Sequence, residues 1–260
     1  SSAHPTYQHE LLTEEYEKFG LRYPSTYRVL HDKHLAEYAE SDYIMVASEF
    51  VERTMVNRGI PAAKLIRVHL GFDPARFCPG EKADNVFRVM YVGRITLQKG
   101  VQYLLQACSQ LNLPRSELVL VGEIEPDARS FLSAFEGTFR HVRYRPQADL
   151  ARFYHQASVL VLPSIQDGFG MVVYEAAACG LPVIVTENVG ATIRDGQDGF
   201  VVPIRDAEAL ARNLTYLYEH PQECASMGQS ALMYVQQFTW ENYHRELVGH
   251  YETMWSTREA

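Results

Sequence analysis

Two carboxylates, Asp167 and Glu175, are the residues best placed for chemistry, because they lie eight positions apart around a glycine pair. Gly168 and Gly170 let the backbone come close to a ligand. If residues 168–175 are mostly helical, the two acids lie roughly 10 Å apart. A retaining glycosidase needs about 5 Å between its carboxylates, so we expect these acids to contact different parts of one ligand. A solvated loop Asp and a surface Glu are the alternative on spacing alone.

Two cations form a second candidate cluster. Residues 87–92 (FRVMYV) read as a strand, Gly93 and Arg94 follow it, and Lys99 stands at the start of an amphipathic helix. Cations at a strand-to-helix turn, beside a helix N-terminus, offer a diphosphate opposite charge, a bidentate fork and a positive dipole end. The alternative is a pair of surface cations whose stems cover apolar neighbours.

Strand-like and helix-like segments alternate around both clusters. This alternation predicts an α/β fold, a doubly wound parallel-sheet Rossmann-like domain, with ligands at the carboxyl ends of the strands. Arg94, Lys99, Asp167 and Glu175 would then share one rim. Strands are expected at 87–92, 117–121, 141–144, 157–162, 182–186 and 200–202, and helices after Lys99 and at 127–135, 149–156, 171–178 and 206–219.

The first seventy or so residues predict an incomplete α/β portion. Ser48 is placed to cap a helix over 49–58. Two strands cannot close a sheet core, and the chain starts at Ser1 without Met, so we expect a piece of a longer enzyme. Helices are also expected at 5–19 and 27–40, and strands at 43–47 and 64–69, before the hinge-like segment GFDPARFCPGEK.

The motifs YVGRITLQKG, VLVGE, VLPSIQDGFGMVVYEAAACGLPVIVTENVG, DGFVVPIRDAEAL and FTWENY together resemble the donor-binding half of family-four glycosyltransferases. These are retaining enzymes of the GT-B fold that use nucleotide sugars without a metal, and the match runs from about Glu40 to the C-terminus. The resemblance implies a remnant of the N-terminal acceptor-side domain at 1–74 and a linker at 75–86. It further implies a donor-binding domain at 87–238 and a C-terminal helix at 239–260 that packs back on the N-terminal part.

The resemblance also implies roles for single residues. Arg94 and Lys99 would hold the donor diphosphate, Asp167 would contact the transferred sugar, and Glu175 would bind the ribose. The base would lie near residues 145–149. The donor-binding set is completed by the backbone groups of Gly93, Gly168, Phe169 and Gly170.

Three departures from the family pattern matter. The first acid is often Glu in the family and is Asp167 here, one methylene shorter. The loop ENVGATIRDG lacks an acid often found there. The family's N-terminal domain should be a whole Rossmann-like unit, and only some seventy residues precede the linker.

The expected function is transfer of a hexosyl group from a UDP- or GDP-linked sugar to a hydroxyl of a glycan or lipid-linked acceptor, as in polysaccharide biosynthesis. We expect no cofactor and no metal. A nucleotide-sugar binding module, inactive without a missing domain or partner, stays open as an alternative from another class. A GT-B sugar-nucleotide epimerase is a third.

Composition limits other functions. The net charge of −8 argues against broad nucleic-acid binding. The sequence has no GxxxxGK[ST] loop and no GxGxxG after a strand, which disfavours ATPase and NAD-binding functions. Four cysteines without a CxxC pairing suggest a reducing cytoplasm. We therefore expect a cytoplasmic protein, either free or in peripheral contact with the inner face of the membrane.

Two other features leave alternatives open. His31, His34 and Glu37 have the spacing of metal ligands, although a charged, solvated helix face is the simpler interpretation. His4 either reaches an active site or caps a helix. Aromatic residues at helical spacing over 240–255 form an apolar stripe too wide to remain exposed to solvent. This predicts self-association if no other domain covers it.

Overall fold

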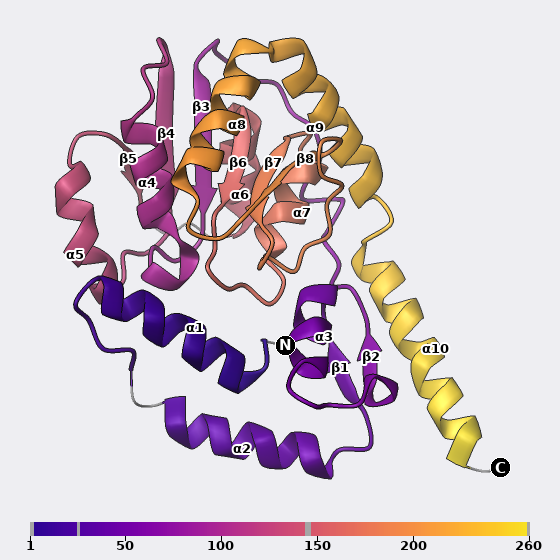
Figure 1. The fold of residues 1–260 in the computed structure, drawn as a ribbon. Coiled ribbons are helices and arrows are strands. Elements are labelled where there is room, and N and C mark those ends of the chain that lie inside the picture. The colour runs from indigo at the N-terminus through magenta and orange to yellow at the C-terminus, as the bar shows by residue number, and fades with distance from the viewer. Residues whose placement is uncertain (1–2, 25–26, 144–146, 259–260) are drawn as a thin grey trace.

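A six-stranded, fully parallel sheet organises the chain (Figure 1). The computed structural model describes residues 3–24, 27–143 and 147–258. The strand order is β5-β4-β3-β6-β7-β8, so the chain starts at the centre, runs to one edge, returns to the centre and runs to the other edge. This is the Rossmann order, with a topological switch point between β3 and β6. The six strands are β3 (Phe87–Val92), β4 (Ser116–Val121), β5 (Arg140–Val142), β6 (Val159–Leu162), β7 (Val183–Thr186) and β8 (Gly199–Val202).

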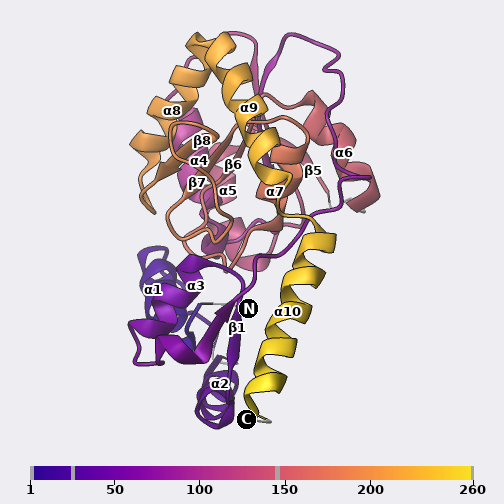
Figure 2. The ribbon, with the colours of Figure 1, turned by 90° about the vertical axis from the view of Figure 1, so that its right-hand side faces the viewer.

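The structure thus confirms the predicted doubly wound α/β fold. β6 and β7 are buried at every position, as expected for short β-branched runs covered on both faces. The helices are α1 (Pro5–Lys18), α2 (Tyr27–Glu40), α3 (Glu49–Val56), α4 (Val101–Ser109), α5 (Arg129–Leu132), α6 (Gln147–Gln156), α7 (Met171–Ala178), α8 (Ala207–Glu219), α9 (Pro221–Val235) and α10 (Trp240–Arg258). Figure 2 shows α4 and α8 on one side of the sheet and α6 and α7 on the other.

The helix expected at 171–178 matches α7 at both ends, and Gly170 precedes it in a left-handed conformation with φ 79°. Other details differ from the sequence expectations. The helix expected over 49–58 ends at Val56. We did not predict α9, whose buried positions include Cys224, Gly228 and Ala231. Such small residues give a weak amphipathic signal, and they suit close packing, since a Cβ on Gly228 would lie 2.2 Å from the carbonyl oxygen of Gly180.

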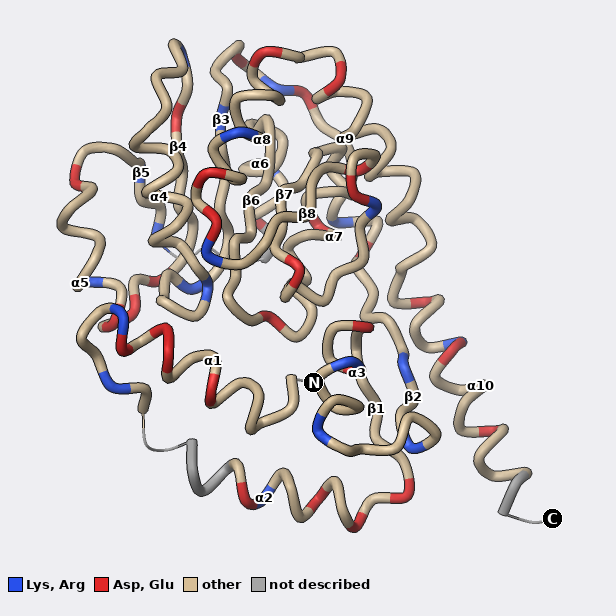
Figure 3. Tube along the Cα trace, viewed as in Figure 1, with Lys and Arg blue, Asp and Glu red and all other residues tan. Residues whose placement is uncertain are grey.

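The N-terminal portion has its own two-stranded parallel sheet, formed by β1 (Ile44–Val46) and β2 (Leu65–Arg67). A small separate core that includes Phe50 and Val51 stabilises it. Ser48 caps α3 as predicted, because its hydroxyl accepts the amide hydrogen of Val51 at 3.2 Å. Acidic positions recur along α1 and α2 (Figure 3). In Figure 1, α1 crosses beneath the six-stranded sheet and α2 lies beyond it.

The chain passes between the two portions twice, and the two passages run side by side. The amide of Phe72 donates to the carbonyl of Phe238, and the amide of Trp240 donates to the carbonyl of Phe72. From here α10 extends away from the sheet (Figures 1 and 2). Three of its aromatic side chains are exposed, Trp240, Tyr251 at 57% and Trp255 at 69%, and Tyr243 is half-buried. The domain boundaries at 74, 86 and 238 stay a prediction.

No helix in the described ranges is both long enough and apolar enough to span a bilayer.

Candidate functional site

The switch point brings together the loops that follow β3 and β6. Neighbouring strands at this point send their connections in opposite directions, which leaves a crevice at the carboxyl ends. Lys99, from the first loop, reaches across it, and its Nζ donates to Oδ2 of Asp167 at 2.6 Å. Both side chains are mostly shielded, with exposed fractions of 18% and 16%. A cation and an acid that were predicted separately therefore meet at one point.

Local hydrogen bonds place Lys99. It ends the 3₁₀ turn η2 (Leu97–Lys99), which Thr96 caps by accepting the Lys99 amide hydrogen at 3.2 Å. Gly100 follows in a left-handed conformation with φ 68°, and a Cβ there would lie 1.9 Å from the carbonyl oxygen of Pro163. Only glycine therefore allows the two loops to approach this closely. The Gln98 carbonyl also accepts the amide of Ile165 at 2.9 Å.

Asp167 is fixed through its backbone. Its amide donates to the carbonyl of Asn188 at 3.0 Å, and its carbonyl accepts the amide of Gly190 at 3.1 Å. The loop after β7 therefore supports the loop after β6. A Cβ on Gly190 would lie 2.2 Å from the Gly168 carbonyl oxygen, which again requires glycine at a close backbone contact.

The residues after Asp167 shape the turn. The amide of Phe169 donates to Oδ1 of Asp167 at 3.3 Å, and its ring is buried at 5% exposure, edge-on to Tyr174. The Gly168 carbonyl accepts a hydrogen bond of 2.8 Å from the hydroxyl of Ser48, which belongs to the N-terminal portion. Thus Phe169 anchors the turn, and Ser48 joins it to α3.

Arg94 borders a hollow of about 430 Å³ next to the Leu97–Lys99 turn. Its side chain is 65% exposed, and its Nη1 lies 3.9 Å from Oε1 of Glu125. Thr96 and Gln98 line the hollow from the sheet side, and Arg22 lines it from the N-terminal portion. Two guanidinium groups thus border a space that is open to a ligand. Gly93 precedes Arg94 with φ 147°, a conformation that favours glycine.

Glu175 is not part of this exposed surface. Its side chain is 3% exposed and accepts a hydrogen bond from the hydroxyl of Tyr154 at 2.9 Å. Burial, together with this carboxylate, raises the pKa of Tyr154 well above its ordinary value. The structure therefore pairs Lys99 with Asp167, leaves Arg94 exposed beside Glu125, and buries the side chain of the second acid, Glu175, which belongs to α7. Its contact with a ribose stays a prediction.

Other predicted features lie as follows. His4 caps α1, because its Nδ1 accepts the amide of Thr6 at 3.2 Å. Nε2 of His31 shares a hydrogen bond with the hydroxyl of Thr6. His34 stacks on Tyr38. The predicted base-binding loop falls partly on residues 144–146, which lie outside the described residues.

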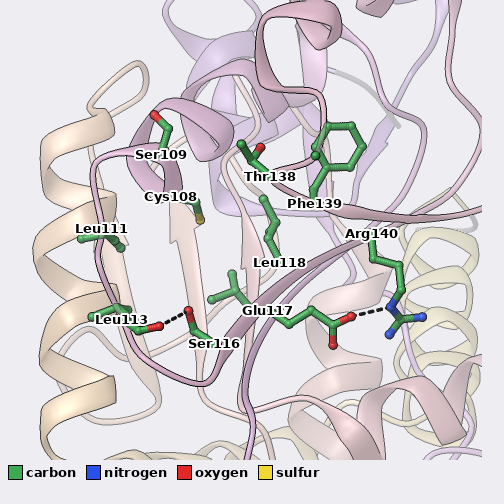
Figure 4. Close-up of a pocket in the computed structure, with 12 residues that line it drawn as sticks. Cys108, Ser109, Leu111, Leu113, Ser116, Glu117, Leu118, Thr138, Phe139 and Arg140 are labelled. Carbon is green, nitrogen blue, oxygen red and sulfur yellow. Dashed lines mark hydrogen bonds and ion pairs between the residues drawn. The ribbon is translucent and has the colours of Figure 1, made fainter.

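A second hollow of about 450 Å³ lies along the loop that follows β7 and beside α3. Val189 and Gly190 line it, and both pair with Asp167 through their backbone. Glu49, Arg53 and Glu187 bring charged side chains to it. Another hollow, of about 540 Å³, lies at the opposite edge of the sheet, near the amino ends of β4 and β5 and the Glu117–Arg140 ion pair (Figure 4).

Comparisons with known proteins agree with this architecture. The model of the family "Glycosyl transferases group 1" matches residues 86–220. A D-inositol 3-phosphate glycosyltransferase from Kribbella flavida is 27% identical over 259 residues, which are 90% of this chain and 61% of that protein. Its counterpart from Arthrobacter sp. is 33% identical over 65% of this chain and 44% of its own length. The chain thus spans about half of the curated relatives it matches.

Solved structures share the fold. Sucrose-phosphate synthase from Thermosynechococcus elongatus superposes with a TM-score of 0.74 and 26% identity, covering 86% of this chain and 61% of that one. Anabaena HepE, solved in complex with UDP and glucose, superposes with a TM-score of 0.76 and 18% identity, covering 89% and 68%.

Proposed function

The chain belongs to the group 1 glycosyl transferases, and from this premise we propose that it transfers a hexosyl group from a nucleoside diphosphate sugar to an acceptor hydroxyl with retention of configuration. One observation carries the proposal above all: the ion pair of Lys99 and Asp167 spans the switch point of a doubly wound sheet. Ligands of such sheets bind in this crevice. An ammonium and a carboxylate there suit a ligand with an anionic part and a hydroxyl-rich part.

The donor diphosphate would lie in the hollow that Arg94 borders. As the glycosidic bond breaks, its electron pair passes to the leaving oxygen of the β-phosphate, where negative charge grows. Preorganised cations that face this oxygen lower the barrier, by roughly 3 to 4 kcal/mol for one well-placed donor. Lys99 would leave Asp167 for the diphosphate, which frees the carboxylate to accept hydrogen bonds from the sugar hydroxyls.

Uridine nucleotides are the first donors to test. HepE has been solved with UDP-glucose, and its fold matches this chain. A GDP-linked sugar is the second choice. For either donor, the chemistry here needs no cofactor.

For the acceptor, we propose a hydroxyl of a glycan or of a lipid-linked saccharide. The second hollow supports this choice, because Gly190 in its wall donates its amide to the carbonyl of Asp167. Carboxylates such as Glu187 hydrogen-bond vicinal hydroxyls. The Glu187→Gln variant should raise KM for the acceptor several-fold and leave KM for the donor unchanged; a change in the donor KM alone would reject this placement.

A nucleotide-sugar binding module is the second candidate function. The chain spans 61% of the length of one curated relative and 44% of another, and this partial coverage favours the module. Calorimetry with UDP and GDP, combined with assays for transfer and hydrolysis of the matching labelled sugar donor, separates the candidates. Binding with transfer supports the transferase, and binding without turnover supports the module. Release of an epimerised sugar without an acceptor would indicate an epimerase, and the absence of binding would reject all three.

A further inference from the structure

The turn that carries Lys99 is fixed at Leu97, through both its amide and its carbonyl. The amide of Leu97 donates to Oδ2 of Asp127 at 2.9 Å, and the carbonyl of Leu97 accepts from Nε2 of Gln102 at 3.1 Å. Leu97 itself is fully buried. Since η2 (Leu97–Lys99) is only one turn long, fixing Leu97 restricts where the stem of Lys99 begins.

Both of these contacts continue to α1. The hydroxyl of Tyr16 donates to the same Oδ2 of Asp127 at 2.8 Å. Nε2 of Gln102 also donates to Oε1 of Glu15 at 2.9 Å. Consecutive residues of α1 therefore hold the turn through two separate intermediaries, one on its amide side and one on its carbonyl side.

Glu15 is a firm anchor for this arrangement. Its side chain has no exposed area, and it also accepts hydrogen bonds from the hydroxyl of Tyr103 at 2.9 Å and from Nε of Arg205 at 2.7 Å. A buried carboxylate with several charge-assisted bonds is costly to leave unpaired. The position of α1 on the sheet is therefore strongly fixed at this point.

We propose that Asp127 and Gln102 are positioning residues for transfer, which hold the Leu97–Lys99 turn against α1 so that the Lys99 ammonium faces the donor diphosphate. This inference rests on the proposed function. Asp127 also lines the hollow that Arg94 borders, but its Oδ2 accepts from the Leu97 amide and the Tyr16 hydroxyl. In this assignment Asp127 and Gln102 therefore act through the turn, and Lys99 contacts the ligand. Because α1 belongs to the N-terminal portion, the two contacts also couple that portion to the phosphate-binding turn.

A double-mutant cycle tests the coupling. Calorimetry measures the dissociation constants of UDP and of uridine for the unaltered chain, Asp127→Ala, Gln102→Ala, Lys99→Ala and the Asp127→Ala/Lys99→Ala pair; if GDP is the nucleotide bound, GDP and guanosine are used. Losing the Asp127 contact with the turn should weaken diphosphate binding about tenfold, the effect of one hydrogen bond to a charged group. Losing the Gln102 contact, which joins two neutral groups, should weaken it by a smaller factor. Nucleoside binding should not change. In the Lys99→Ala background, Asp127→Ala should have no further effect.

Tyr103→Phe is the matched control. It removes a hydrogen bond to the buried carboxylate of Glu15, which Gln102 also contacts, but the Tyr103 hydroxyl bonds to Glu15 and not to the turn. The diphosphate affinity of this variant should therefore equal that of the unaltered chain. Three results would overturn the proposal: equal weakening of the nucleoside by Asp127→Ala, an additive effect on top of Lys99→Ala, or a Tyr103→Phe effect as large as that of Asp127→Ala.

Hydrogen exchange provides a reading that needs no ligand. The Leu97 amide should exchange faster in Asp127→Ala and at the unaltered rate in Tyr103→Phe. If the unaltered chain binds no nucleotide, the proposed function fails, whereas the exchange rate still decides whether Asp127 holds the turn. Should Asp127→Ala not fold, the UDP and uridine affinities of Gln102→Ala test the contact on the carbonyl side of Leu97. The exchange rate of the Leu97 amide is then measured in Tyr16→Phe.

Discussion

Replacing Lys99 by alanine should abolish most of the activity while leaving the fold intact. The ammonium of Lys99 lies 2.6 Å from the Asp167 carboxylate, and both groups are more than four-fifths shielded from solvent. In such surroundings a preorganised cation stabilises developing charge far more than it would in water. Removing one donor of this kind lowers kcat by roughly 100-fold to 1,000-fold.

The cost in stability should be smaller. Without Lys99, the Asp167 carboxylate keeps the Phe169 amide at 3.3 Å, and its 16% exposed side chain gains room for water where the ammonium stood. A partly unsatisfied charged group costs about 1–3 kcal/mol. The midpoint of thermal unfolding should therefore fall by only a few degrees.

The assay follows transfer of labelled sugar from the donor, together with calorimetric affinity for the nucleoside diphosphate. Lys18→Ala is the control, because Lys18 pairs with Glu14 on an exposed helix surface, at exposed fractions of 42% and 55%. Such pairs contribute about 0–1 kcal/mol, and the control should show normal turnover. Turnover of Lys99→Ala within threefold of the unaltered chain would refute the assignment.

Three further predictions concern the supports of the site. Gly100→Ala should destabilise the fold by about 2 kcal/mol or more, since its φ of 68° and a carbonyl 1.9 Å from the new Cβ strain the turn; chemical denaturation measures this, and an unchanged midpoint would contradict it. Tyr154→Phe should cost about 1–3 kcal/mol by removing the bond to buried Glu175, measured in the same way, and a stabilised variant would argue against that bond. Burial tends to raise the pKa of Asp198, but hydrogen bonds from Arg194 outweigh it and hold that pKa below its ordinary value. The ion pair of Asp198 and Arg194 therefore stabilises the fold above about pH 4, and this stabilisation is lost as pH falls through the lowered pKa. In Asp198→Asn the free energy of unfolding should fall less steeply with acid. An unchanged slope in a pH series of unfolding measurements would count against the pair.

The centre of the sheet was predictable because β6 and β7 are short apolar runs buried at every position and β3 is buried at all but its first. The strand over 87–92 matches β3 at both ends, and the Ser48 cap was predicted from residue type alone. The rim shared by Lys99 and Asp167 followed from one rule, that ligand-binding loops follow the carboxyl ends of parallel strands. In these cases local pattern and global fold agree.

The remaining features depend on contacts between distant segments, for which this single sequence gave no signal. Tyr16 and Asp127 are separated by 111 positions, and Ser48 and Gly168 by 120, yet each pair is hydrogen-bonded. The burial of Glu175 was equally hidden, because it depends on the facing Tyr154 of another helix.

The most direct test of the central claim is a crystal structure of this chain with the nucleoside diphosphate that it binds. We predict pyrophosphate oxygens within hydrogen-bonding distance of the Lys99 ammonium and the Arg94 guanidinium, at the switch point between β3 and β6. A nucleotide bound instead at the opposite edge, near Glu117 and Arg140, or bound with its phosphates directed away from Lys99, would contradict the claim.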